Sequence, residues 1–126
     1  MGIAGGIAVS LETWADALAD EVKAGRARAV GVSNCDAGQT GCAHAALTAR
    51  GVLLACNEVE YSLLNRGPER SGLVTTCREL GVTLIAYRPR AMGMLTGKYS
   101  PEQPPRGLQF CKAYLAKIAP LIASKV

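Results

Sequence analysis

The chain has 126 residues, of which 49% are hydrophobic, and its 14 basic and 10 acidic side chains give a formal charge of +4. This length allows one domain with a core but falls short of a closed eight-unit β/α barrel, which needs about 250 residues. The charges are spread along the chain without a basic run or interleaved aromatic residues, which argues against nucleic-acid binding and is compatible with anionic small ligands.

The first half of the chain predicts a helix, a strand and a second helix. Apolar residues at helical spacing indicate a helix from Ser10 to Lys23, with Ser10 as its N-cap and Gly25 as its stop. A short strand follows over 27–32. Asp36 opens a second helix that continues through residue 49.

The second half repeats the alternation. The run 52–59 is nearly continuous in apolar character, as a buried parallel strand is, and a polar loop follows over 61–68. A helix is predicted over 69–80 and a strand over 82–87. The segment 91–108 is rich in Gly and Pro, and 108–124 has helical spacing that Pro120 would interrupt. This order predicts an α/β protein with three parallel strands and right-handed crossovers.

The cysteine pattern bears on the cellular compartment of the chain, and the lengths of its apolar runs bear on membrane spans. The five cysteines include no C-x-x-C pair, which argues against a disulfide framework or a metal site and favours a reducing compartment, the cytoplasm. A plastid or another organelle is the alternative if a leader sequence is missing. Cys56 and Cys77 are expected to be small buried hydrophobic side chains, and the single histidine, His44, to be structural or on the surface. No apolar run reaches the ~18 residues of a membrane span, so no membrane partner is expected.

All three predicted strands run into polar residues. The carboxyl ends of parallel strands face the binding crevice of α/β proteins, so these junctions are the expected ligand site. Three segments then resemble the aldo-keto reductase family in order and spacing: GRARAVGVSN at 25–34, NEVEYS at 57–62, and GVTLIAYRP at 81–89 followed by LTGKY at 95–99. Members are (β/α)8 TIM barrels that reduce carbonyls with NADPH. The resemblance therefore implies a partial barrel, with 1–126 as a single partial domain and 1–10 unassigned.

The resemblance assigns cofactor-binding roles to individual residues. Ser33 and Asn34 correspond to the pair that hydrogen-bonds the nicotinamide carboxamide, and an amide such as Asn34 supplies both a donor and an acceptor. Glu58 stands where the family usually has Gln, and an ionised carboxylate cannot donate a hydrogen bond. Tyr87 corresponds to the aromatic residue that stacks on the nicotinamide ring.

Two arginines depart from the family pattern at the same strand end. Arg88 replaces the usual Ser beside the pyrophosphate, and Arg90 replaces an apolar residue. Guanidinium groups pair with phosphate in a bidentate way, so the two residues either attract the pyrophosphate or crowd its groove. Tyr61, Lys98 and Tyr99 belong to family-like segments without an assigned chemistry.

The catalytic set of the family has no match in this chain. Members use a tyrosine as proton donor, assisted by a lysine, an aspartate and a histidine from earlier β/α units, and no Tyr-Gly-x-x-Glu run occurs here. The basic segment that binds the adenosine 2′-phosphate is also absent. We therefore expect no catalytic residue in this chain and no efficient turnover by it alone.

Two hypotheses of function remain open. In the first, the chain is part of an NADPH-dependent reductase of small carbonyl substrates, represented by a fragment. In the second, it is a non-catalytic relic or interaction module. Three parallel strands cannot close a barrel, so their exposed edges are expected to pair with a second copy or with another polypeptide.

Overall fold

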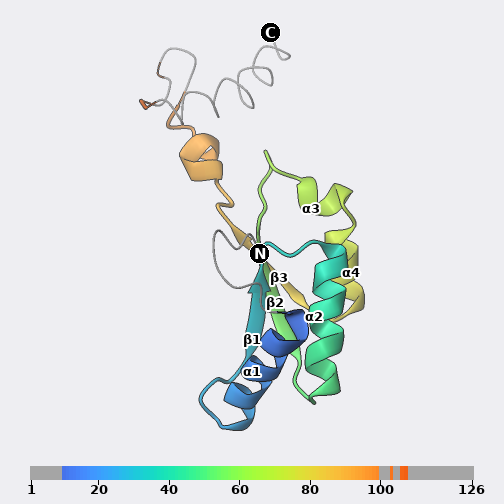
Figure 1. Ribbon diagram of the computed structural model, residues 1–126. Helices are drawn as coiled ribbons and strands as arrows, with labels where there is room; N and C mark the ends of the chain where they lie inside the picture. Colours follow the sequence, from blue (N-terminus) through green and yellow to red (C-terminus); the bar gives the residue numbers. More distant parts are fainter. Residues whose placement is uncertain (1–9, 100–102, 104–105, 108–126) are drawn as a thin grey trace.

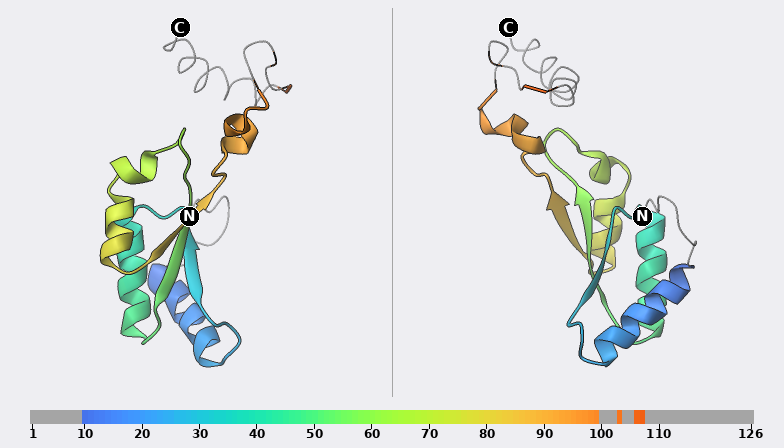
Figure 2. Two further views of the ribbon diagram at one scale, coloured as in Figure 1. Left: turned by 180° about the vertical axis from the view of Figure 1, so that it is seen from behind. Right: turned by 60° about the vertical axis from the view of Figure 1, so that its left-hand side comes forward.

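The fold is an open sheet of three parallel strands covered by helices on one face (Figures 1 and 2). This computed structural model describes residues 10–99, 103, 106 and 107. The strands are β1 (Val30–Ser33), β2 (Leu54–Glu60) and β3 (Thr83–Tyr87), in the order β1-β2-β3. All three carboxyl ends therefore lie at one edge of the sheet. The α/β class and the parallel sheet are as the sequence predicts.

Helices fill the connections between the strands. They are α1 (Leu11–Lys23), α2 (Ala37–Ala49), α3 (Gly67–Arg70) and α4 (Leu73–Glu79), and a 3₁₀ helix η1 (Ala91–Thr96) follows β3. The Ser10 side chain accepts a hydrogen bond from the Thr13 backbone N–H at 3.2 Å, which confirms the predicted N-cap. Asp36 and Gln39 form a reciprocal capping box at the start of α2.

The predicted single helix over 69–80 is wrong, because the chain forms two helices there. Gly72 has a φ of +78° between α3 and α4, a left-handed conformation that glycine adopts without steric cost. The first of the two begins earlier than predicted, at Gly67, with Pro68 in its first turn, where a missing N–H costs nothing. The strand limits also move, since β1 begins at Val30 rather than at 27 and β2 extends to Glu60.

The core lies between the sheet and the helices. Small side chains bring α1 and α2 together, because Ala15, Ala19 and Ala43 are buried there. Leu47 is 0% exposed and is among the largest fully buried side chains. Cys77 is buried as predicted, whereas Cys56 is only half-buried, because it lies on the face of the sheet that the helices do not cover. The predicted helix over 108–124 and the unassigned residues 1–9 lie outside the described part.

The other face of the sheet has no helix over it within the described residues (Figure 2). The register pairs Ser33 with Glu58 and Glu58 with Ile85, so these side chains share that face, together with Tyr87 two residues further on. Ile85 is 43% exposed there. Among the described residues, no helix is long and apolar enough to cross a membrane.

Candidate functional site

A chain of hydrogen bonds joins the ends of all three strands. The Ser33 hydroxyl donates to the Glu58 carbonyl oxygen at 3.1 Å, and the Asn34 backbone N–H donates to the same oxygen at 2.8 Å. The Asn34 side-chain amide donates to the Ser33 hydroxyl at 3.1 Å. The Tyr87 hydroxyl in turn donates to the Asn34 amide oxygen at 2.9 Å. The structure thus brings together four of the six residues that the sequence selects, although only the backbone of Glu58 takes part.

The backbone turns sharply at Asn34, where φ is +56°. Asn is one of the few side chains besides Gly that enters this left-handed region readily. The turn ends β1 and leads into Asp36, the N-cap of α2. Asn34 therefore serves both the local fold and the position of its own amide.

The amide of Asn34 has unused hydrogen-bonding capacity. An asparagine amide has two N–H donors and two acceptor lone pairs, and Ser33 and Tyr87 use one of each. One donor and one acceptor remain on an exposed side chain at the sheet edge. This is the pattern that a primary carboxamide complements, so the residues present fit the amide end of a nicotinamide cofactor.

The two arginines do not occupy equivalent positions. Arg88 has a φ of +53°, and its guanidinium carbon lies 5.8 Å from the centre of the Tyr87 ring. A cation–π contact of this kind at an exposed site contributes about 0.5–1 kcal/mol. Arg90 is exposed and lies at the start of η1, where its carbonyl oxygen accepts the Gly93 backbone N–H at 3.0 Å. Arg88 therefore lies near the aromatic ring of Tyr87, whereas Arg90 lies at the start of η1.

A buried polar pair behind the turn was not selected from the sequence. Asn57 is 0% exposed, and its side-chain amide donates to the Cys35 carbonyl oxygen and to the Thr40 hydroxyl, both at 2.9 Å. The Thr40 hydroxyl donates to the Asp36 carbonyl oxygen at 2.7 Å, so it must act as acceptor toward Asn57. The pair fixes the segment that follows Asn34 against β2. A single Asn inside an apolar strand was the available signal, since such a residue needs buried partners.

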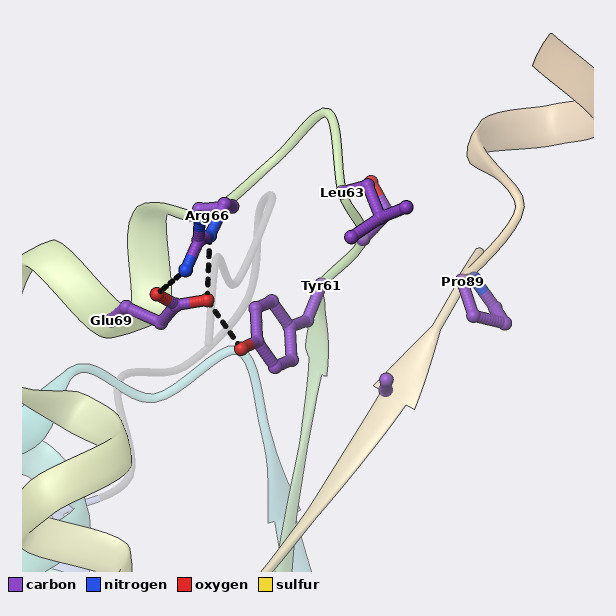
Figure 3. Close-up of a pocket in the computed structure, with 7 residues that line it drawn as sticks. Tyr61, Leu63, Arg66, Glu69 and Pro89 are labelled. Carbon is purple, nitrogen blue, oxygen red and sulfur yellow. Dashed lines mark hydrogen bonds and ion pairs between the residues drawn. The ribbon is translucent and has the colours of Figure 1, made fainter. Parts of the chain in front are cut away.

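A separate pocket of about 530 Å³ lies beside the end of β3 (Figure 3). Ala86 lines this pocket and alternates with Tyr87 along the strand, so the pocket lies on the other face of the sheet from the polar cluster. Within it, the Tyr61 hydroxyl donates to Glu69 Oε1 at 2.5 Å, and Arg66 Nε donates to the same oxygen at 2.8 Å. These bonds tie the loop after β2 to α3.

The Arg66 guanidinium, and secondarily the Tyr61 hydroxyl, hold the pKa of the Glu69 carboxyl at about 2. A carboxylate with a lowered pKa stabilises the fold above its ordinary value of 4.5 and loses that contribution as the pH falls toward 2. The side chain is one-third exposed, so solvent screens part of this effect. The interactions of the Glu69 carboxylate that line this pocket should therefore weaken in acid.

Replacing Arg66 by Met is expected to flatten the acid dependence of stability between pH 4.5 and pH 2, because Glu69 then loses the largest cause of its lowered pKa and keeps only the smaller effect of the Tyr61 hydroxyl. Urea denaturation midpoints at pH 6 and pH 3 measure this. The wild type should lose more stability between these two values than the variant does. Arg78→Met, at an exposed position in α4, is the matched control and should behave as the wild type. Equal pH dependence of Arg66→Met and the control would contradict the assignment.

Comparison with known proteins identifies the family. The model of the aldo/keto reductase family matches residues 6–118. The chain belongs to the aldo/keto reductase family. This confirms the resemblance stated from the sequence, and the fold agrees with it. A crystal structure of a thermostable aldo-keto reductase with the inhibitor epalrestat superposes with a TM-score of 0.65 and 34% identity, over 74% of this chain and 33% of that one.

Curated members of the aldo/keto reductase family align with most of this chain. The chloroplastic pyridoxal reductase of Arabidopsis thaliana is 45% identical over 77% of the chain, and the L-glyceraldehyde 3-phosphate reductase of Escherichia coli is 39% identical over 71%. The chain spans 26% of the length of each. The aldo-keto reductase yakc [NADP(+)] of Schizosaccharomyces pombe is 36% identical over 77% of the chain and 28% of its own length.

Proposed function

We propose that this chain supplies the carboxamide-binding part of an NADPH site in an aldo-keto reductase that reduces a small carbonyl substrate. The observation that carries the proposal is the exposed Asn34 amide, which keeps one donor and one acceptor free while Ser33 and Tyr87 hold it in place. Membership of the family, and the NADP(+) in the name of the yakc relative, support NADP(H) as the group bound.

Each residue of the cluster has a distinct part in this site. Asn34 pairs with the nicotinamide carboxamide, and the Ser33 hydroxyl orients the Asn34 amide through the bond between them. Tyr87 offers an aromatic surface to the nicotinamide ring, and its hydroxyl donates a hydrogen bond to the side-chain amide oxygen of Asn34. NADPH, when bound, supplies the hydride. Arg90 is the cation that pairs with its phosphates, whereas Arg88 stays near the ring of Tyr87.

The proton that a reduced carbonyl requires has no proposed donor in this chain. General acid catalysis contributes about 10²–10⁴-fold to such a step. None of the residues in the cluster takes the part of the family's proton-donating tyrosine. We therefore expect the 126 residues alone to bind cofactor without efficient turnover. The catalytic groups belong to the remaining units of a complete barrel.

The substrate class follows the names of the relatives. Pyridoxal and L-glyceraldehyde 3-phosphate are both small aldehydes, so we place the substrate of the complete enzyme in that class. The four described cysteines have free thiols, which supports a reducing compartment such as the cytoplasm; the chloroplastic relative makes a plastid the alternative.

A thermal melt followed by far-ultraviolet circular dichroism, with and without excess NADPH, tests the proposal. Selective binding to the folded state at 100 times Kd contributes about 2.7 kcal/mol, which raises Tm by about 10 °C in a domain of this size. The control ligand is 2′-phospho-ADP-ribose, which lacks nicotinamide and should stabilise the chain less. A melt that NADPH leaves unchanged would refute the proposed site.

The open sheet supports a second candidate, an interaction module that pairs through its strands. The outer edges of β1 and β3 have no neighbouring strand among the described residues, and Ile85 is exposed on the bare face. The same melts separate the two candidates when they are repeated at several protein concentrations. A module of this kind has a Tm that rises with protein concentration and does not respond to NADPH.

A further inference from the structure

We propose that the carboxylate of Glu58 makes this site bind oxidised NADP⁺ in preference to NADPH. The inference rests on the proposed function and adds to it a determinant of which redox form of the cofactor the site favours. It starts from the position of Glu58 in the sheet and from the charge that its side chain brings there.

The position of Glu58 is fixed by two hydrogen bonds to its carbonyl oxygen, one from the Ser33 hydroxyl and one from the Asn34 backbone N–H. Parallel pairing sets Glu58 beside Ser33 on one side and beside Ile85 on the other. Its side chain therefore shares the uncovered face with Ser33 and Tyr87, and it is exposed there. A ring whose carboxamide pairs with Asn34 and which lies on Tyr87 has this carboxylate as a neighbour.

The two forms of the cofactor differ in the charge of that ring. The nicotinamide of NADP⁺ is a cationic pyridinium, whereas the ring of NADPH is neutral, and the phosphate groups are the same in both. Attraction or repulsion at the phosphates therefore cancels when the two affinities are divided. A carboxylate beside the ring favours the cationic form, and this preference survives in the ratio of the two Kd values.

The opposing charge in the same region is Arg88, whose guanidinium lies against the Tyr87 ring. A cation there disfavours the pyridinium for the same reason that Glu58 favours it. Removing the charge of Glu58 and removing that of Arg88 should therefore change the ratio of the two Kd values in opposite directions. A change in the shape of the site would not produce this pattern. Arg90 is exposed at the start of η1 and is proposed to act on the phosphates, so its effect on the ratio is expected to be smaller.

The test is isothermal titration calorimetry of the full chain with NADP⁺ and, separately, with NADPH. Glu58→Gln keeps the size of the side chain and removes its charge. It should lower the preference for NADP⁺ over NADPH by about 3–10-fold, the range for a partly screened charge near the ring. Arg88→Gln should raise the same preference. Both changes should shrink as the salt concentration rises.

Glu79→Gln is the matched control, because it removes the same charge from the exposed end of α4, which leads into the amino end of β3. It should leave the ratio unchanged. A ratio that Glu58→Gln does not change, in a chain that binds both forms, would overturn this inference and leave the proposed function standing. Failure of the wild type and the variant to bind either form would overturn both.

Discussion

Leu47→Ala is expected to lower the free energy of unfolding by about 2–5 kcal/mol, the range for a fully buried leucine whose neighbours relax only in part. Leu47 is 0% exposed in the layer between α2 and the sheet. Its backbone carbonyl also accepts the N–H groups of Arg50 and Val52, which end α2 and start the return to β2. The substitution leaves those backbone bonds in place and removes only the packing. Urea denaturation followed by circular dichroism measures the loss.

Leu53→Ala is a matched control six residues away. The same atoms are removed from a side chain that is 76% exposed, so the expected change is within about 0.5 kcal/mol. A loss at Leu53 as large as that at Leu47 would mean that a further surface covers Leu53 in solution. Equal and small losses at both positions would contradict the core described for this chain.

The sequence predicts a helix well where one face of the helix is apolar and a polar side chain caps its first turn. The stripe in α1 and the acidic N-cap of α2 predict their elements to within a residue or two, because burial and capping act locally. The break at Gly72 was missed because a glycine inside an apolar pattern is compatible with both a helix and a turn. Only the packing of α3 and α4 decides between them.

The candidate site was predictable as a set of strand ends but not as a network. Parallel strands place their carboxyl ends at one edge, so Ser33, Asn34 and Tyr87 follow from topology once the strands are identified. The bond from Tyr87 to Asn34 spans two strands and depends on the left-handed turn, which no local pattern specifies. The placement of Arg88 on the ring likewise required the φ of +53° at that residue.

Asn57 shows the same limit for a buried group. Its place in an apolar strand indicates that it needs partners, yet those partners come from the loop after β1 and from α2. They are 17 and 22 residues away in the chain. The partners of a buried amide are set by the register of the sheet, and the sequence alone did not determine that register.

Asn34→Asp is expected to weaken NADPH binding by about tenfold or more, since loss of a hydrogen bond and the addition of a like charge each oppose an anionic ligand. Asp has nearly the size of Asn and also tolerates the left-handed backbone at this position, so the fold should persist. The substitution removes both N–H donors, one of which holds Ser33 and the other of which is free for the carboxamide. Isothermal titration calorimetry with NADPH measures the change, and a thermal melt without cofactor checks the fold.

Arg78→Gln is the control for net charge, because it also lowers the charge by one but lies in the last turn of α4. If the loss at Asn34 were a general charge effect, the two variants would weaken binding equally. Asn34→Gly separates the remaining two causes, since it relieves the backbone, removes the amide and adds no charge. Weaker binding by both Asn34 variants, with normal binding by Arg78→Gln, assigns the effect to the amide. Wild-type affinity in Asn34→Gly would instead locate the cofactor contacts outside the cluster of Ser33, Asn34 and Tyr87.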